Sequence, residues 1–186
     1  MRAPGLVAID LTPPDFAEGL DDWSSGDGTP DSPTYEDAAH ARIAVADADF
    51  DTCLEMRKIE PVQRLRYMAE LPIRHGSYVE IRARLKVLRG ALPGVRIAAW
   101  PGGLHGRRVE DLADAAPVML IRAHDAVVQI SAVIGPRPEA GVDIVWDGRV
   151  LYAHVGLDLV GPVGAVVRIE RLVVRDVTAS FGESPG

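Results

Sequence analysis

The stretch YVEIRARLKVL, residues 78–88, alternates apolar and charged side chains almost without a break. The apolar positions are Val79, Ile81, Ala83, Leu85 and Val87, and the charged positions are Glu80, Arg82, Arg84 and Lys86. Because successive side chains of an extended strand point to opposite faces, this pattern predicts a β-strand with one buried face and one solvated face.

Similar short runs recur along the chain with turn residues between them. We predict further strands near residues 41–46, 51–57, 62–70, 94–100, 117–122, 126–134, 141–146, 150–159 and 165–177. The segment 107–116 is the best candidate for a turn or two of helix, but no convincing amphipathic helix is present. Many short strands at this spacing are typical of an all-β fold, an antiparallel β-sandwich of the jelly-roll type.

The length of 186 residues is enough for one domain with a sizeable core. We place an N-terminal arm at 1–14, a single β-sandwich domain at 15–178 and a mobile tail at 179–186. Residues 21–38 are rich in Gly, Pro, Ser and Asp and predict one long loop, in which Trp23 fits a core position better than an exposed docking position. Gly161 and Gly164 fit tight turns that need a positive φ.

Charge and cysteine content narrow the classes of partner. The net charge of −7 argues against a nucleic-acid binder. The single cysteine, Cys53, forms no internal disulfide, which suits a reducing cytoplasm or a particle assembled there. We find neither a signal peptide nor an apolar run long enough to cross a membrane, so we expect no membrane insertion and release by another route, such as cell lysis.

The common signatures of catalysis are missing from the sequence. There is no Gly-x-Ser-x-Gly motif, Cys53 lies in an alternating strand as a buried residue would, and the histidines lack metal-ligand spacing. Carboxylates that could be paired as glycosidase acids are Glu70, Glu80, Asp143 and Asp158, but any polar sheet face offers such pairs. We therefore predict no enzyme activity, no cofactor and no metal.

Calcium is the closest alternative among the metals. Asp47, Asp49 and Asp51 stand at alternate positions in DADFD, which superficially suits oxygen ligation. The EF-hand pattern fails because neither its Gly nor its distant Glu is in register. A solvated acidic loop is the simpler interpretation.

One polar face could carry a binding site. If strands 62–70, 78–88, 94–100 and 150–159 share a sheet, its outer side displays Arg66, Arg82, Arg84, Arg96, Trp100, Tyr152 and His154, with Arg64 and Glu70 nearby. Arginine binds carboxylates bidentately and an aromatic ring stacks on a sugar, so the set suits an anionic polysaccharide. The same residue types also favour a protein interface, and they are common on an ordinary solvated face.

Several segments in order carry a resemblance to a known family. They are GLDDWSSGDGTP, DFDTCLE, LRYMAELPI, GALPGVRIAAW, GVDIVW and HVGLDLVGPVGAVVRI, spread over residues 10–178. The chain resembles the head-spike base proteins of gene transfer agents, which are phage-like particles. It is also similar to the N-terminal β-sandwich of alphaproteobacterial β-helix spike proteins, which are labelled pectate-lyase-like, and to jelly-roll carbohydrate-binding modules.

The resemblance implies a structural role without catalysis. Such a protein would be a homo-oligomer that links the capsid protein at a vertex to a spike fibre protein and contacts surface polysaccharide. No β-helix follows the sandwich in these residues, so the resemblance implies no lyase activity here. The alternative is a stand-alone carbohydrate-binding module for acidic polysaccharide.

Overall fold

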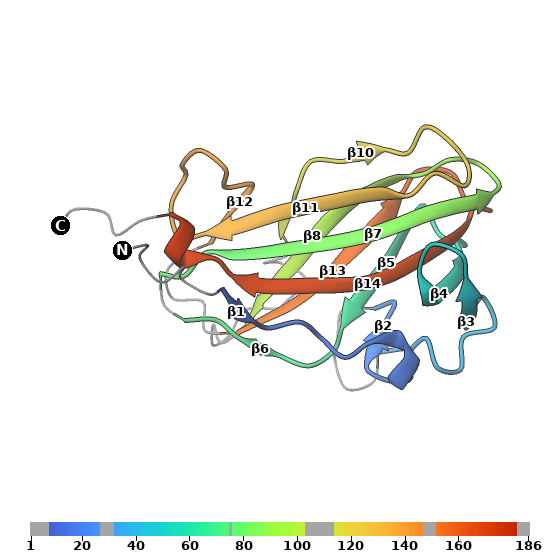
Figure 1. Cartoon of the computed structure of the whole chain (residues 1–186), viewed down its shortest axis with the longest axis horizontal. Coiled ribbons are helices and arrows are strands. Elements are labelled where there is room, and N and C mark those ends of the chain that lie inside the picture. Colours follow the sequence, from blue (N-terminus) through green and yellow to red (C-terminus); the bar gives the residue numbers. More distant parts are fainter. Residues whose placement is uncertain (1–7, 27–31, 75, 103–113, 147–151, 182–186) are drawn as a thin grey trace, which may run out of the picture.

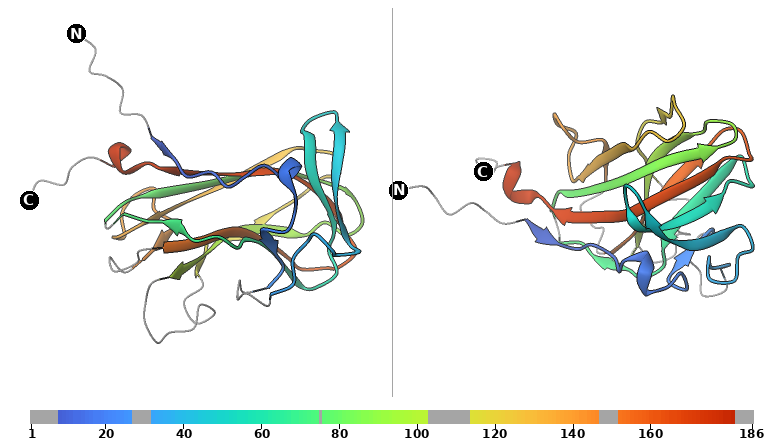
Figure 2. Two further views of the ribbon diagram at one scale, coloured as in Figure 1. Left: turned by 90° about the horizontal axis from the view of Figure 1, so that it is seen from below. Right: turned by 45° about the vertical axis from the view of Figure 1, so that its right-hand side comes forward.

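Two antiparallel sheets lie face to face in the computed structural model, which describes residues 8–26, 32–74, 76–102, 114–146 and 152–181. The sheet nearer the viewer in Figure 1 is called the front sheet, and the other is the back sheet. Figure 2 shows the two layers edge-on, with one hairpin standing out from the front sheet. The predicted β-sandwich is confirmed.

The front sheet has seven strands in the order β12-β11-β7-β14-β4-β3, with β1 paired to β14. Only the β11–β12 pair is parallel among its described pairings. The strands are β12 (Ile144–Val145), β11 (Val128–Gly135), β7 (Val79–Arg89), β14 (Val166–Asp176), β4 (Asp51–Arg57), β3 (Ala41–Asp47) and β1 (Ile9–Asp10).

The back sheet also has seven strands, in the order β10-β8-β13-β5-β2, with β6 paired to β13 and β9 paired to β8. They are β10 (Met119–Leu120), β8 (Gly94–Gly102), β13 (Tyr152–Val160), β5 (Val62–Tyr67), β2 (Trp23–Ser24), β6 (Leu71–Pro72) and β9 (Asp114–Ala115). Two short 3-10 helices, Phe16–Glu18 and Thr178–Ser180, complete the described elements.

The core lies between the sheets and follows the alternation read from the sequence. The five apolar positions of β7 are all buried, and they belong to one apolar cluster with the inward residues of β13: Ala153, Val155, Leu157 and Leu159. Because one face of each strand is buried in this way, a slip of one residue would turn the apolar set outward. The pattern therefore fixes the register as well as the fold.

The predicted strands correspond to the long strands of both sheets and to the two-residue strands β10 and β12, while four other two-residue strands were not predicted. β1, β2, β6 and β9 have two residues each, too few to show a period. β2 interrupts the predicted loop 21–38, and Trp23 is buried against Phe16 and Tyr67, as expected for a core residue. The helical segment expected at 107–116 lies mostly outside the described residues, and Asp114–Ala115 form β9 instead.

Both ends of the described chain pack on the front sheet. Ile9 and Asp10, within the arm placed at 1–14, pair with Asp176 and Arg175 of β14. At the other end, Phe181 stacks on Tyr78 with 4.1 Å between ring centroids. The sheet thus extends beyond the boundaries 15–178 at its N-terminal side, and the rest of the tail lies outside the described residues.

The turn glycines take the conformations expected of them. Gly161 and Gly164 have φ values of +98° and +100° in the β13–β14 connection. The carbonyl of Gly161 accepts a hydrogen bond of 2.8 Å from the buried Lys58 ammonium, which also binds the carbonyls of Glu60 and Pro61. This lysine therefore ties the β4–β5 connection to the β13–β14 connection. The described residues include no helix long and apolar enough to span a membrane.

Candidate binding face of the back sheet

Three neighbouring strands of the back sheet bring most of the predicted site residues together. β13 lies between β8 and β5, and its residues His154, Gly156 and Asp158 face outward. The register sets Trp100 opposite His154, Arg96 and Arg64 on either side of Asp158, and Arg66 opposite Gly156.

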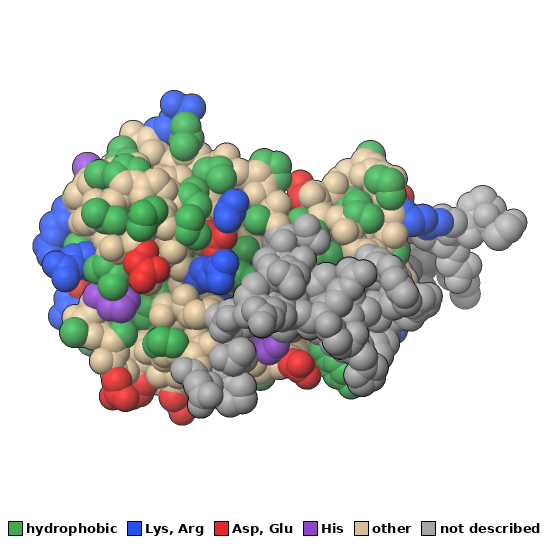
Figure 3. Space-filling model, turned by 180° about the vertical axis from the view of Figure 1, so that it is seen from behind, with side chains coloured by type: hydrophobic (Ala, Val, Ile, Leu, Met, Phe, Trp, Pro, Cys, Tyr) green, Lys and Arg blue, Asp and Glu red, His purple; other side chains and the backbone are tan. Residues whose placement is uncertain are grey.

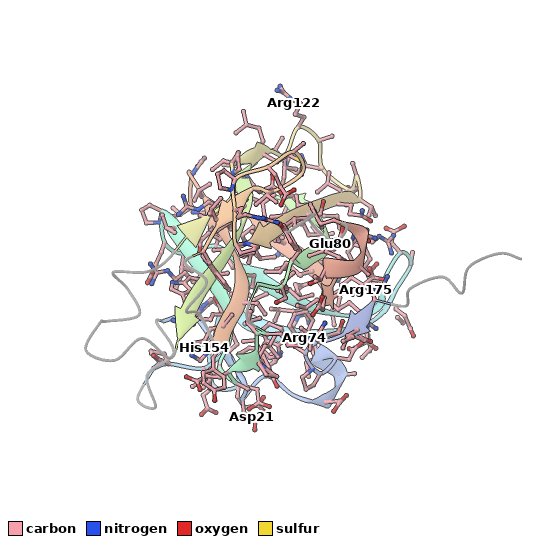
Figure 4. All side chains as sticks on the ribbon, turned by 90° about the vertical axis from the view of Figure 1, so that its left-hand side faces the viewer. Asp21, Arg74, Glu80, Arg122, His154 and Arg175 are labelled. Atoms are coloured by element: carbon pink, nitrogen blue, oxygen red, sulfur yellow. The ribbon has the colours of Figure 1, made fainter. Side chains whose placement is uncertain are left out.

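The expectation that strand 78–88 belongs to the same sheet is wrong. β7 is a central strand of the front sheet, so Arg82 and Arg84 lie on the opposite side of the molecule from Trp100. Figure 4 shows His154 at one layer and Glu80 and Arg175 at the other. Alternation along a strand shows which side chains share a face, but it does not show which strands are neighbours.

Arg66 and Trp100 form the buried centre of this face. The guanidinium carbon of Arg66 lies 4.6 Å from the centroid of the Trp100 ring, and both side chains are at most 1% exposed. Their strands are separated by β13, where Gly156 has no side chain to stand between them, and Ala98 of β8 is small. A cation over an aromatic face is stabilised most when both groups are withdrawn from water.

Arg64 and Arg96 lie beside the same centre and are less buried than Arg66. The guanidinium of Arg64 is 5.6 Å from the Trp100 ring, and the residue is half-buried. Arg96 donates from Nε and Nη2 to Oδ2 of Asp158, both at 2.9 Å, while its own side chain is 32% exposed. This ion pair fixes the buried Asp158 carboxylate at the sheet surface.

Two polar atoms of this face are buried with no hydrogen-bond partner in the described structure. They are the indole Nε1 of Trp100, a donor, and Oδ1 of Asp158, an acceptor. Buried polar atoms are nearly always paired, so an unpaired donor and an unpaired acceptor on one face are unusual.

His154 and Tyr152 lie at the edge of the same face. Burial, followed by the positive charge of Arg66, lowers the pKa of His154 below its usual 6.5. Its Nδ1 is 3.3 Å from the Tyr67 carbonyl, and its Nε2 is 3.8 Å from the exposed carboxylate of Glu70. His154 is thus neutral at pH 7, whereas Tyr152 is 41% exposed and available to a ligand. On this side of the molecule, basic, acidic and apolar side chains are interspersed (Figure 3).

The other chemically suggestive residues are used in packing or ion pairs. Cys53 is fully buried, and burial, with Asp47 as the next cause, raises the pKa of its thiol to about 11. Glu80 and Asp143 belong to the front-sheet side, away from Glu70 and Asp158 of the back sheet. No group of metal-ligating side chains that could hold a metal ion occurs among the described residues.

The acidic stretch at 47–51 matches the solvated loop that the sequence suggested at Asp49 and Asp51, which are exposed, but not at Asp47. Asp47 is buried and accepts hydrogen bonds from Lys86 at 2.8 Å and from Arg168 at 2.6 Å. Asp49 also binds Lys86, at 2.7 Å. The sequence could not show this because the two cations come from β7 and β14, far along the chain.

Solved structures with the same fold include polysaccharide-binding domains. The xylan-binding CBM22-1 domain of Paenibacillus barcinonensis Xyn10C has a TM-score of 0.62 at 10% identity, over 94% of this chain and 99% of that one. A second CBM22 xylan-binding domain has a TM-score of 0.55 at 10% identity, over 91% and 94%. The enzymatically active domain of bacteriophage CBA120 tailspike protein 4 has a TM-score of 0.51 at 13% identity, over 87% of this chain and 20% of that one.

The comparisons define a class of fold. The chain has the β-sandwich fold found in carbohydrate-binding modules, and a domain of a phage tailspike has a similar fold. No protein-family model and no curated protein sequence matches the chain.

Proposed function

We propose that this chain is a non-catalytic carbohydrate-binding domain whose site is the outer face of β8, β13 and β5. The observation that carries the proposal is the pair of unsatisfied buried atoms, Nε1 of Trp100 and Oδ1 of Asp158. A sugar hydroxyl both accepts and donates a hydrogen bond, so hydroxyls of a saccharide bound along this face can satisfy each of the two atoms. The shared fold with CBM22 xylan-binding domains supports this function.

Because Trp100 is buried, a ligand can reach its ring only after a side chain that covers the ring has moved away. Arg64 is the side chain best suited to leave, because it is half-buried and forms no ion pair within the described residues. When Arg64 swings away, the indole becomes a stacking surface for the apolar face of a sugar ring. Arg66 stays packed on the ring and holds it in place, while Arg96 and Tyr152 contact polar substituents at the rim.

The test is calorimetric titration of the wild-type domain with xylan and acidic oligosaccharides chosen from a glycan array. Trp100→Ala abolishes binding, and Arg64→Ala tightens it about threefold to tenfold because the ring no longer has to be uncovered. Arg42→Ala, on the edge of the front sheet, leaves affinity unchanged. Binding by no glycan overturns the function, and an unchanged affinity in Arg64→Ala overturns the site even if Trp100→Ala fails to fold.

The second candidate function is the base of a head spike in a gene-transfer-agent particle, a structural protein without catalysis. The likeness to a phage tailspike domain supports it, together with the resemblance in sequence. In this role the chain is a homo-oligomer that binds capsid and fibre proteins, is assembled in the cytoplasm and is released by lysis. Sugar binding is compatible with it, because a spike base can touch the host surface.

Mass spectrometry of density-purified, nuclease-resistant particles from the native host tests the second candidate. A fixed ratio of this chain to the capsid protein supports it. Absence from particles, with the chain free in the medium or lysate, overturns it and leaves the carbohydrate-binding function standing alone.

A further inference from the structure

A basic depression lies on the outer face of the front sheet, on the opposite side of the molecule from Trp100. Its volume is about 160 Å³, and β11, β7 and β14 form it. The side chains that matter for its chemistry are Arg82, Arg84, Gln129, Arg171, Val173 and Arg175.

Its charge is positive, although the chain as a whole is strongly acidic. Four arginines line the depression against one carboxylate, that of Glu170. The Glu170 carboxylate forms an ion pair with Nη1 of Arg84 at 3.0 Å, and the Glu80 carboxylate forms one with Nη2 of Arg82 at 2.8 Å. Counting the carboxylates of Glu170, Glu80 and the nearby Asp10 against the four arginines leaves a net charge of +1 on a protein of net charge −7.

Two of the arginines, Arg171 and Arg175, are not engaged in a close ion pair within the described part of the chain. Arg171 and Arg175 are exposed and form no salt bridge with any described residue. Asp10 pairs with Arg175 along the backbone of β1 and β14, and its carboxylate accepts the Thr12 N–H at 2.9 Å. The Thr12 hydrogen bonds, followed by the charges of Arg175 and Arg171, lower the pKa of Asp10, so this carboxylate is a nearby anion that is not bonded to either arginine. Both guanidinium groups therefore have their donors available for an external anion.

A bulge in β14 builds one end of the depression. Ile169 pairs with Leu85 and Leu172 with Ala83, so β14 has two residues, Glu170 and Arg171, where β7 has only Arg84. A bulge of this kind aims side chains in directions that a regular strand cannot. At the same end, the Arg84 guanidinium lies 5.5 Å over the ring of Phe50, in the hairpin that stands out from this sheet (Figure 2).

We propose that this depression binds a uronic acid unit of an acidic polysaccharide, with its carboxylate on Arg171 or Arg175. The guanidinium fork matches a carboxylate in shape and charge. The Gln129 amide offers a donor and an acceptor to sugar hydroxyls, and Val173, opposite Arg82, offers an apolar contact to the ring. A nucleic acid fits poorly, because it requires many phosphate contacts and the rest of the surface repels it.

The site does not depend on the proposed site of the back sheet, so either can fail without the other. The probe is a trimer of galacturonic acid, titrated by calorimetry and by amide chemical shifts on the full chain. The matched ligand is the same trimer with its carboxylates methyl-esterified, which removes the charge and keeps the sugar.

The matched variants remove the same charge at two places on the front sheet. Arg171→Gln/Arg175→Gln weakens binding of the acidic trimer at least tenfold. Arg57→Gln/Arg89→Gln, two exposed arginines near the base of the hairpin, changes it less than twofold. Trp100→Ala leaves the shifts on β7 and β14 unchanged. A thermal melt of each variant confirms that it is folded.

Three outcomes would overturn the proposal. The first is no binding of the trimer by the wild-type chain. The second is an equal loss in both double variants, which would mean that only overall charge matters. The third is equal affinity for inorganic phosphate or for the methyl-esterified trimer, which would leave either a general anion site or a neutral-sugar site.

Discussion

Arg66 and Trp100 stack across β13 at 4.6 Å, although their own strands, β5 and β8, do not pair with each other. A third residue, Gly156 of β13, lies between the two strands, where a Cβ would meet the β5 backbone at Leu65 and Arg66. Arg66, Gly156 and Trp100 come from three different strands, so the stack forms only when β5, β13 and β8 are assembled in this order.

Arg66→Ala should lower the free energy of unfolding by about 3 kcal/mol, because it removes a fully buried side chain and leaves a cavity beneath Trp100. Urea unfolding followed by far-UV circular dichroism measures the change. Arg42→Ala is the control, since its side chain is 68% exposed and its ion pair with Glu55 is worth about 0.5 kcal/mol or less. Equal losses in the two variants would mean that the stack contributes nothing.

Gly156→Ala should destabilise the chain by more than backbone strain alone can explain. A Cβ at this position would lie 2.0 Å from the Leu65 carbonyl oxygen and 3.0 Å from the Arg66 Cα, both backbone atoms of β5. The strand pair has to separate, at a cost of about 2–3 kcal/mol.

The control for that variant is Gly161→Ala. Gly161 has a φ of +98° and open space around it, so alanine there meets strain of about 1–2 kcal/mol and no clash. The two free energies of unfolding come from the same urea titration. If Gly161→Ala costs as much as Gly156→Ala, the close approach of β5 to β13 is not what selects glycine.

The fold was predictable because the long strands alternate apolar and polar residues in the sequence. The sequences of β7 and β13 alternate apolar with other residues over most of their length, and such a period fixes an element, its inward face and its fold class. Burial alternates in step along much of β7, whereas nearly all of β13 is buried. Which strands share a sheet was not predictable, since pairing depends on contacts between distant segments. Arg82 and Arg84 were therefore assigned to the face of Trp100 when they belong to the other sheet.

The site was predictable in part for the same reason. Arg66, Arg96, Trp100 and His154 were named from their outward parity, and the structure does bring them together. The deep burial of Arg66, Trp100 and His154 was not predicted, because parity does not reveal what covers a face. Gly156 could have been noticed, since a glycine inside a strand often marks a close backbone approach. The bulge that presents Arg171 leaves no such signal.

Stability should fall with acid below about pH 4, and Asp47 is the principal cause. Burial by itself raises the pKa of Asp47. The hydrogen bonds from Lys86 and Arg168 and from two backbone N–H groups lower this pKa by more than burial raises it, so the net pKa is well below 3.8. A carboxyl whose pKa is depressed by folding stabilises the folded state above its unfolded value, and that contribution is lost as the pH falls through the folded value.

Asp47→Asn should remove the contribution of Asp47 to the pH dependence of stability and should also destabilise the folded state at neutral pH. At pH 7 it should lower the free energy of unfolding by about 3–5 kcal/mol, because Lys86 stays buried and keeps only the half-exposed Asp49 as its anion. Between pH 5 and pH 2.5, its stability should fall less steeply than that of the wild type. Urea midpoints across this range provide the measurement, and parallel slopes would contradict the assignment.

Cys53 should be unreactive toward thiol reagents in the native protein and should report on the hairpin β3–β4. Its thiol is buried with Ala44 and Phe50 in a small cluster under the hairpin, and its pKa of about 11 leaves about one thiolate in a thousand at pH 8. Unfolding in urea should therefore accelerate its reaction with a chromogenic disulfide more than a hundredfold.

The Asp47→Asn variant should react faster than wild type while still folded, because the ion pairs from Asp47 to Lys86 and Arg168 hold the hairpin tip against the sheet. Rapid reaction of the folded wild type would instead mean that the hairpin opens freely and that the ion pairs do not hold it.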